Sequence, residues 1–210
     1  MRRAKLGDVY AVKVPNGYKI IQWAYFIEKY GTFIRVFDGL YEKSPTNIAE
    51  IVAGEHSYVT DLFVGRAYRI GLLDFLGNYP VPAAYPFPES QIAFYEKQGK
   101  VFGFRIEQRH ASNIYRFDSD TALTTTSVLP EEYHNVKRLA HCVSPDWLLY
   151  LFDNDFSLDR VDVFYPWIYL GECWEDRYQI YIDMVENAME KDRINRKKQN
   201  CESSCARQTI

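Results

Sequence analysis

The sequence lacks an apolar run that approaches the roughly 20 residues a membrane-spanning helix requires. Its basic first residues run directly into Gly7 and Asp8, without the apolar segment of a secretory signal. All four cysteines lie in the last third of the chain, where they cannot cross-link the first half. Such cysteine usage is typical of a reducing compartment. The sequence therefore predicts a soluble cytoplasmic protein that does not enter a membrane.

The sequence also lacks the short motifs of common catalytic sites. It has no His-Glu-x-x-His zinc motif, no Gly-x-Ser-x-Gly nucleophile turn and no phosphate-binding glycine loop with its lysine. We therefore predict no catalytic residue and no cofactor. An enzyme with a His-and-carboxylate site assembled from distant segments stays open as an alternative. Its candidate histidines are His56, His110, His134 and His141.

Two patterns match known metal sites only in part. Residues 153–159 alternate oxygen-bearing side chains as a calcium loop does, but the sixth and twelfth positions hold Leu158 and Phe164 instead of glycine and glutamate. Cys201 and Cys205 are four residues apart, and no second pair with zinc-finger spacing accompanies them. We therefore predict no metal site.

Aromatic residues, in contrast, make up 16% of the chain, and they favour sheets because flat rings pack well on pleated surfaces. The first 38 residues predict an antiparallel meander of three strands. The first strand shows alternation over 8–14 and ends at the Asn16-Gly17 turn; the second, over 18–28, is apolar on both faces, and the third covers 32–38. A strand apolar on both faces is expected to be covered on both sides.

The rest of the chain mixes strand and helix patterns. Further strands are expected over 58–64 and 67–76, a hairpin over 91–96 and 100–108, a proline-rich surface connection over 79–88 and irregular structure over 109–128. Helices are expected over 45–53, 130–142, 144–152 and 174–198, the last with an apolar stripe. We predict one α+β domain over 1–200, antiparallel β-rich and barrel-like over 1–120 and helical over 130–198, with a disordered tail over 200–210.

Charge is concentrated in one segment. Residues 121–172 carry three basic and eight acidic side chains, a balance of −5 in a chain whose total is −3. One interpretation is a solvated acidic turn, and another is a docking patch for a basic protein. The candidate partner-binding residues are Asp153, Asp155, Phe156, Asp159, Asp162, Tyr165, Trp167, Tyr25 and Tyr41. For each aromatic residue among them, packing in the core is the competing interpretation.

The opening segment 5–12 (KLGDVYAV), followed by 16–22 (NGYKIIQ), resembles the start of the immunity protein 26 family of bacterial polymorphic-toxin systems. Motifs at Leu62-Phe63-Val64, Ile70-Gly71, Leu76-Gly77 and the prolines of 80–88 extend the likeness over roughly the first half of the chain. In one departure, the family has Gly-Arg-Trp before its Ile-Gly, where this chain has Arg69 and then Ile70. The shared motifs are mainly turns and core residues, so they bear on the fold more than on the function.

The resemblance implies a cytoplasmic antidote that binds one cognate toxin, often a nuclease with a basic substrate cleft, and blocks it without turnover. The alternative is a barrel-like module that binds nucleic acid or nucleotides. It rests on arginines interleaved with aromatic residues, a mixture that can clamp and stack a strand: Arg105, Arg109, Arg116, Phe104, Tyr115 and Phe117. Acidic neighbours dilute this pattern, and an ordinary exposed hairpin has the same appearance. With a net charge of −3 the chain is a poor non-specific ligand for phosphate backbones, so we do not expect nucleic acid to be the main partner.

Overall fold

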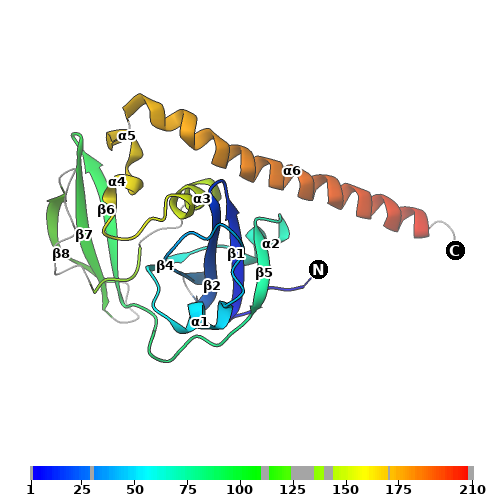
Figure 1. The fold of residues 1–210 in the computed structure, drawn as a ribbon, viewed down its shortest axis with the longest axis horizontal. Coiled ribbons are helices and arrows are strands. Elements are labelled where there is room, and N and C mark those ends of the chain that lie inside the picture. Colours follow the sequence, from blue (N-terminus) through cyan, green and yellow to red (C-terminus); the bar gives the residue numbers. More distant parts are fainter. Residues whose placement is uncertain are drawn as a thin grey trace.

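The chain folds into two antiparallel sheets followed by helices, as Figure 1 shows for the computed structural model. The structure describes residues 2–28, 31–109, 114–123, 135–139, 144–169 and 171–207. The predicted α+β class, with the β-rich part first and the helices toward the C-terminus, is confirmed.

The first sheet has five strands in the order β4-β3-β2-β1-β5. The strands are β1 (Asp8–Val14), β2 (Gly17–Ile27), β3 (Gly31–Val36), β4 (Tyr58–Asp61) and β5 (Leu73–Asn78). Strands β1 to β3 form the predicted meander, and β5 returns to pair with the free edge of β1. At the β1–β2 turn, Gly17 has a φ of +152°, and a Cβ there would lie 2.4 Å from the carbonyl oxygen of Tyr41. The turn therefore needs the glycine that the sequence supplies.

Strand β2 is covered on both faces only in its first half. Residues 19–22 are all buried, as expected from their apolar neighbours on both sides. Phe26, near the far end of the strand, is 61% exposed. The prediction that the whole of 18–28 is covered was therefore wrong for its last residues.

The expected strand over 67–76 is instead helix α2 (Val64–Arg69) followed by β5. Gly71 adopts a φ of +82°, which ends the helix and turns the chain toward β5. The Leu72 amide donates a hydrogen bond to the Ala67 carbonyl across this turn (3.1 Å). The predicted short helix over 45–53 is confirmed as α1 (Ile48–Ala53).

The second sheet has three strands in the order β6-β7-β8. The predicted hairpin is confirmed as β6 (Ser90–Lys97) and β7 (Lys100–Arg109). Strand β8 (Ile114–Leu123) pairs with β7, although 109–128 was predicted to be irregular. That prediction is wrong at 109 and 114–123, because an edge strand tolerates polar residues that would be excluded from the middle of a sheet, and its remaining residues lie outside the described part.

A short extended segment joins the two sheets. The Val59 amide of β4 donates to the Lys137 carbonyl (2.6 Å), and the Leu139 amide donates back to Val59 (2.9 Å). The Ile92 amide of β6 donates to the Arg138 carbonyl (2.7 Å). Hydrogen bonds to both sheets replace those of a helix, so the helix predicted over 130–142 was wrong at 135–139, and its remaining residues lie outside the described part.

Helices cover the first sheet. The predicted helix over 144–152 is confirmed as α3 (Pro145–Asp153), which contacts β1 and β2. Two short helices, α4 (Val161–Phe164) and α5 (Pro166–Tyr169), and a 3-10 turn at Gly171–Cys173 lead into α6 (Trp174–Arg207).

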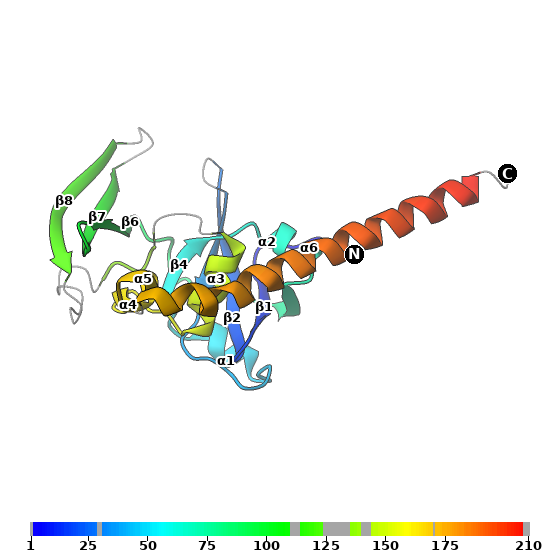
Figure 2. The same cartoon turned by 90° about the horizontal axis from the view of Figure 1, so that it is seen from above.

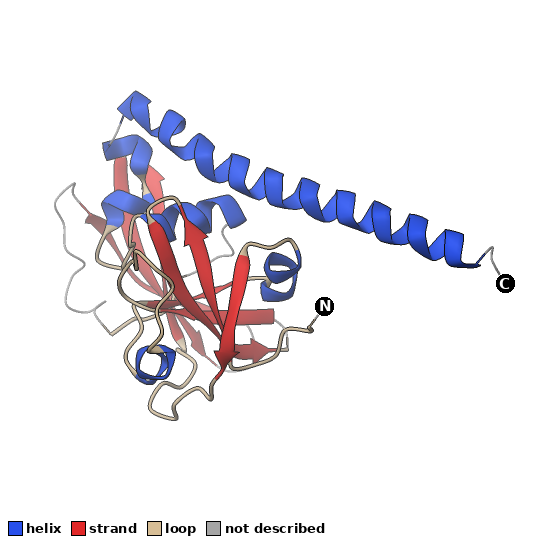
Figure 3. Cartoon of the chain, turned by 45° about the vertical axis from the view of Figure 1, so that its right-hand side comes forward, coloured by secondary structure: helices blue, strands red, loops and turns tan. Residues whose placement is uncertain are grey.

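The long helix α6 buries Tyr181 and Val185 on its predicted apolar stripe. It is helical to Arg207, beyond the end expected near residue 198. Figures 1 and 2 show α6 passing over α3 and alongside α2 before its last turns extend away from the body. Figure 3, in which strands are red and helices blue, shows the same extension from a third direction.

Aromatic rings hold these helices together. Trp147 of α3 has ring contacts with four aromatic residues: Tyr150 at 5.3 Å, Tyr178 at 5.5 Å, and Phe164 and Trp167 at 6.1 Å. Phe156 contacts both Tyr58 of β4 (5.5 Å) and Phe164 of α4 (5.7 Å). Burial of such large rings, with tilted and edge contacts between them, stabilises the helical layer against the sheet.

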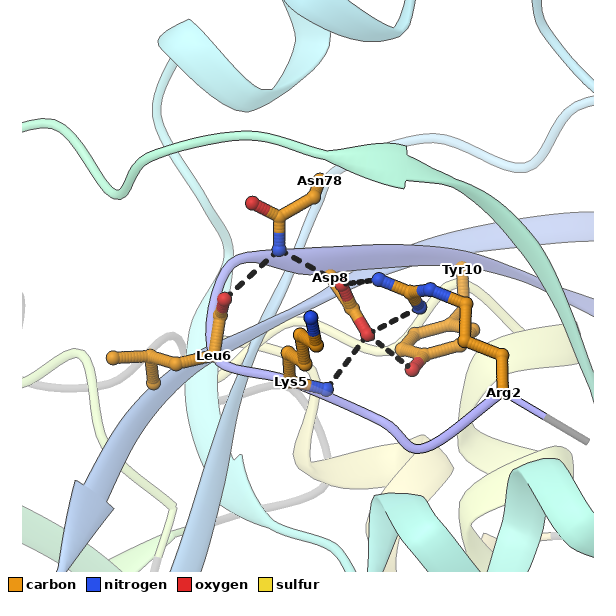
Figure 4. Close-up of polar contacts among 6 residues, drawn as sticks. All are labelled: Arg2, Lys5, Leu6, Asp8, Tyr10 and Asn78. Atoms are coloured by element: carbon orange, nitrogen blue, oxygen red, sulfur yellow. Dashed lines mark hydrogen bonds and ion pairs between the residues drawn. The ribbon is translucent and has the colours of Figure 1, made fainter.

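A buried carboxylate fastens the N-terminus to the first sheet (Figure 4). The Asp8 side chain is fully buried and accepts a bidentate pair of bonds from Arg2 (2.6 and 2.7 Å). It also accepts bonds from the Lys5 amide (2.7 Å), the Tyr10 hydroxyl (3.0 Å) and the Asn78 amide group (2.8 Å). Burial alone would raise the pKa of Asp8, but these hydrogen bonds, above all that from Arg2, outweigh burial and hold the pKa below its usual value.

We expect Asp8→Asn to lower the free energy of unfolding at neutral pH by about 2–4 kcal/mol, because it leaves buried donors without their anionic acceptor. Urea unfolding measures the loss, and Asp74→Asn on the exposed part of β5 is the matched control, with a change of about 0.5 kcal/mol or less. Because the folded pKa of Asp8 lies below its ordinary 3.8, its stabilisation is present above that pH and is lost as pH falls through the folded pKa. Equal stabilities of the two variants at pH 7 would refute the role of Asp8.

Candidate functional site

The acidic segment 153–162 forms the end of α3, the loop to α4 and the start of α4. Its first carboxylate, Asp153, is buried and accepts bonds from the Asn16 backbone amide (2.8 Å) and side-chain amide (2.9 Å). It accepts a third bond from the Tyr181 hydroxyl (2.6 Å). Asp153 thus ties α3 to the β1–β2 turn and to α6, and it is not part of an exposed surface.

The next carboxylate, Asp155, lies at the surface and pairs with Lys19 of β2. The Lys19 side chain is fully buried, whereas that of Asp155 is 47% exposed, so this ion pair reaches from the sheet to solvent. Tyr41 lies close by: burial raises the pKa of its hydroxyl, and the negative charges of Asp155 and Asp38 raise it further. Asp155, Asp38 and Tyr41 therefore share one side of the molecule.

The last two carboxylates of the segment are exposed. Asp159 accepts a hydrogen bond from the Ser157 hydroxyl, and Asp162 forms a 3.4 Å ion pair with Arg160. Arg160 also donates to the Asn154 carbonyl (3.0 Å), which holds the loop closed on itself. Exposed contacts of this kind contribute little stability, so Asp159 and Asp162 can exchange them for contacts with a partner.

The aromatic candidates separate into two groups. Phe156 and Tyr165 are buried in the core, and half-buried Tyr25 donates a hydrogen bond to the Tyr85 carbonyl (2.7 Å). Only Trp167 is substantially exposed, at 39%, while its ring still contacts Tyr165 at 5.0 Å. Core packing is thus the role of Phe156 and Tyr165, and Trp167 is the aromatic residue that stands at the surface.

The residues that remain available are Tyr41, Asp155, Asp159, Asp162 and Trp167, and we refer to them as the acidic surface. Four of these five lie on the loop between α3 and α4 or on the short helices that follow it. The hydrogen bonds of Asp153 and the Lys19–Asp155 ion pair hold the start of that loop against the β1–β2 turn, β2 and α6. This arrangement can bind a cationic surface.

A second cluster, which sequence reasoning missed, surrounds Arg35 in the middle of β3. This arginine is fully buried and donates to His56 Nδ1 (3.2 Å), Gln22 Oε1 (3.1 Å) and the Val52 (3.0 Å) and Gly54 (2.7 Å) carbonyls. All four acceptors are uncharged. The signal in the sequence was a single arginine inside the apolar run of 32–37.

Aromatic rings complete the surroundings of Arg35. Its guanidinium carbon lies 4.5 Å from the centre of the Tyr85 ring and 4.9 Å from that of Phe37. Burial lowers the pKa of Arg35, although not enough to neutralise a guanidinium. The proline-rich connection therefore covers this cluster with Tyr85, which gives the cluster a structural role.

His56 is the catalytic candidate that lies in this cluster. Burial, followed by the charges of Arg35 and Lys137, lowers its pKa from 6.5 to about 4. Its Nδ1 accepts from Arg35, and its buried Nε2 has no hydrogen-bond partner among the described residues. His56 is thus a neutral ligand of a buried cation. The other three candidate histidines, at 110, 134 and 141, lie outside the described residues.

The arginine-rich hairpin and the metal sites considered from the sequence can be compared with the described residues. The side chains of Arg105, Arg109 and Arg116 lie outside the described part, where only the backbone of β7 and β8 is given. Within the described ranges, no group of three histidine, cysteine or acidic side chains is arranged to hold a metal ion. No helix in those ranges is both long and apolar enough to cross a bilayer.

Comparisons of the whole chain with known proteins give no match, whether to protein-family models, curated sequences or solved structures. The likeness to the immunity protein 26 family therefore stays a prediction from the residues that carry it. Among those residues, Gly7 and Asp8 have structural roles: a Cβ at Gly7 would lie 2.7 Å from the Tyr79 carbonyl oxygen, and Asp8 anchors the N-terminus.

We expect Asp153→Ala to reduce the free energy of unfolding by about 3 kcal/mol, since it removes a buried carboxylate together with its three hydrogen bonds to Asn16 and Tyr181. Tyr181→Phe, which removes one of these bonds, should reduce it by about 1 kcal/mol. Asp159→Ala on the same loop is the control and should change it by no more than about 0.5 kcal/mol. Chemical denaturation compares the three, and similar losses for Asp153→Ala and Asp159→Ala would contradict the assignment.

The lowered pKa of His56 predicts a distinct pH dependence of the free energy of unfolding. Its folded pKa of about 4 lies below the ordinary 6.5, so the unfolded chain binds a proton at a pH where the folded protein does not. The stability that depends on neutral His56 is therefore fully present above pH 6.5 and declines by up to about 3 kcal/mol as pH falls toward 4. His56→Gln keeps an acceptor for Arg35 and should flatten this part of the curve of unfolding free energy against pH. The other histidines contribute equally to both proteins, so parallel curves would exclude His56 as the source.

Proposed function

We propose that this chain is a non-catalytic immunity protein that binds and neutralises a cationic bacterial toxin in the cytoplasm. The observation that carries the proposal is the exposure of Asp159, Asp162 and Trp167 on the segment from the α3–α4 loop to α5, which follows buried Asp153. The resemblance of the opening strands supports the class of partner. The charge of the loop and the hydrogen bonds within it support the manner of binding.

Electrostatics makes the acidic surface suited to rapid capture. Carboxylates gathered on a loop attract a cationic partner during diffusion and raise the association rate above the value for uncharged surfaces. Nucleases carry basic side chains around the cleft that receives their anionic substrate. Asp155 and Asp162 are paired with Lys19 and Arg160, so the negative charge that such a cleft would meet in place of phosphates comes mainly from Asp159.

Slow dissociation depends on buried contacts at the interface and not on long-range charge. Large rings that enter a pocket of the partner exclude water and supply much of the binding energy at protein interfaces. Trp167 is available for this, because part of its ring is exposed while contacts with Trp174 (5.7 Å) and Tyr165 hold the rest in place. A side chain that is already ordered loses little entropy on binding.

The test uses the toxin encoded beside the gene for this chain. Co-expression should rescue growth, and the purified proteins should form a complex in gel filtration. Reversing two charges with Asp159→Lys and Asp162→Lys should slow association about ten- to a hundredfold at low salt. Trp167→Ala should mainly accelerate dissociation, by about tenfold or more.

Glu186→Lys with Glu190→Lys on α6 makes the same change in net charge away from the acidic surface and is the matched control. Stopped-flow association should separate the two pairs, with the control within about threefold of the unchanged protein. Absence of both rescue and complex would reject the immunity function. Equal slowing by the two pairs would instead show that the acidic surface is not the binding site.

A further inference from the structure

A groove lies between α6 and the turn that joins α2 to β5, on the part of the molecule where α6 begins to leave the body (Figures 1 and 2). It has a volume of about 540 Å³. Its walls come from β1, from the α2–β5 turn and from α6, with a polar extension farther along the helix between Arg69 and Asn200. Residues distant in sequence are thus combined in one open site.

Three cations stand around this groove on both of its walls. Lys13 projects from β1, Arg69 from the end of α2 and Lys191 from α6, and all three are exposed. Within the part of the chain that the structure describes, none of them forms an ion pair with a carboxylate. The acidic residue of the groove, Asp192, is paired with Arg196 at 2.8 Å. Counted over the described residues that line it, the groove therefore carries a net positive charge.

The inner part of the groove is aliphatic. Ile70 and Leu72 line it from the turn, and Met184 and Ala188 line it from α6. Methionine adapts its shape to different apolar partners, and none of the described residues that line the groove has an aromatic ring on which a nucleobase would stack. An aliphatic floor with cations above it is complementary to a ligand that carries both carboxylates and an aliphatic side chain.

We propose that this groove is a second binding site, one that takes an acidic peptide segment of a partner protein with an aliphatic anchor residue. The anchor fills the space between Leu72 and Met184, while flanking carboxylates meet Arg69 and Lys191 on opposite walls. Along α6 the groove runs from Met184 to Asn200, a rise of about 24 Å, which an extended segment of about seven residues spans.

This site does not depend on the proposed immunity function. It lies beside β5 and α2, whereas the acidic surface lies around α4 and α5, on the other side of the first sheet in Figure 1. The two sites have opposite charge and would take partners of opposite charge. Loss of toxin binding would leave the groove as it is, so the two proposals fail separately.

Fluorescence anisotropy with labelled peptides of about eight residues tests the groove on the full chain. The main probe carries glutamates on both sides of a central leucine. Its counterparts replace the leucine by serine or the glutamates by lysine, and an oligothymidylate of about eight nucleotides tests for nucleic acid. We expect the main probe to bind about tenfold more tightly than either counterpart, with an affinity that falls as salt is added.

Charge reversal locates the binding. Arg69→Glu with Lys191→Glu should weaken the main probe by about tenfold or more, because an attraction on each wall becomes a repulsion. Lys100→Glu on the β6–β7 hairpin with Lys197→Glu on the outer face of α6 makes the same change in total charge and should leave the affinity within about twofold. All four residues are exposed, and Lys191→Met offers a second variant that keeps the helix while removing one cation.

Several results would overturn the proposal. Equal binding of the leucine and serine peptides would show that the aliphatic floor takes no part. Equal weakening by the two pairs of reversals would show that binding follows total charge and not the groove. Tighter binding of oligothymidylate than of the main probe would assign the groove to nucleic acid instead of an acidic peptide.

Discussion

The buried carboxylate of Asp153 is the contact on which the arrangement of the molecule depends. It is the last residue of α3, and its three hydrogen bonds reach the β1–β2 turn and α6. A buried anion requires donors in good geometry, so each of these elements can occupy only the position that satisfies it. The burial of aromatic rings supplies attraction between the layers, whereas Asp153 selects the one packing in which the turn, α3 and α6 meet.

Both candidate binding surfaces follow from that constraint. The loop that carries Asp155, Asp159 and Asp162 begins immediately after Asp153, so its direction is determined by where α3 ends. The groove has α6 as one wall, and α6 is held by Tyr181 to the same carboxylate. Asp153 therefore helps to position both the acidic surface and the positively charged groove. The two proposed surfaces thus carry opposite charges on separate faces of a chain whose net charge is −3.

The sequence predicts local patterns better than it predicts partners. The hairpins, α3 and the stripe of α6 follow from alternation, turn residues and 3.6-residue spacing. The segment 137–139 does not, because its conformation is set by hydrogen bonds to β4 and β6, which are distant in the chain. The acidic segment shows the same limit: nothing local distinguishes buried Asp153 from exposed Asp159, since the donors that bury Asp153 come from residues 16 and 181.

The same reasoning bears on what the family likeness can support. Its clearest residues, Gly7 and Asp8, are needed for a close backbone approach and for anchoring the N-terminus, so any chain with this sheet would benefit from them. Residues that maintain a fold do not determine which partner binds. The partner has to be recognised by side chains that the fold leaves exposed, such as Asp162 and Trp167. Because these side chains lie outside the shared motifs, two proteins with the same opening strands can bind different partners.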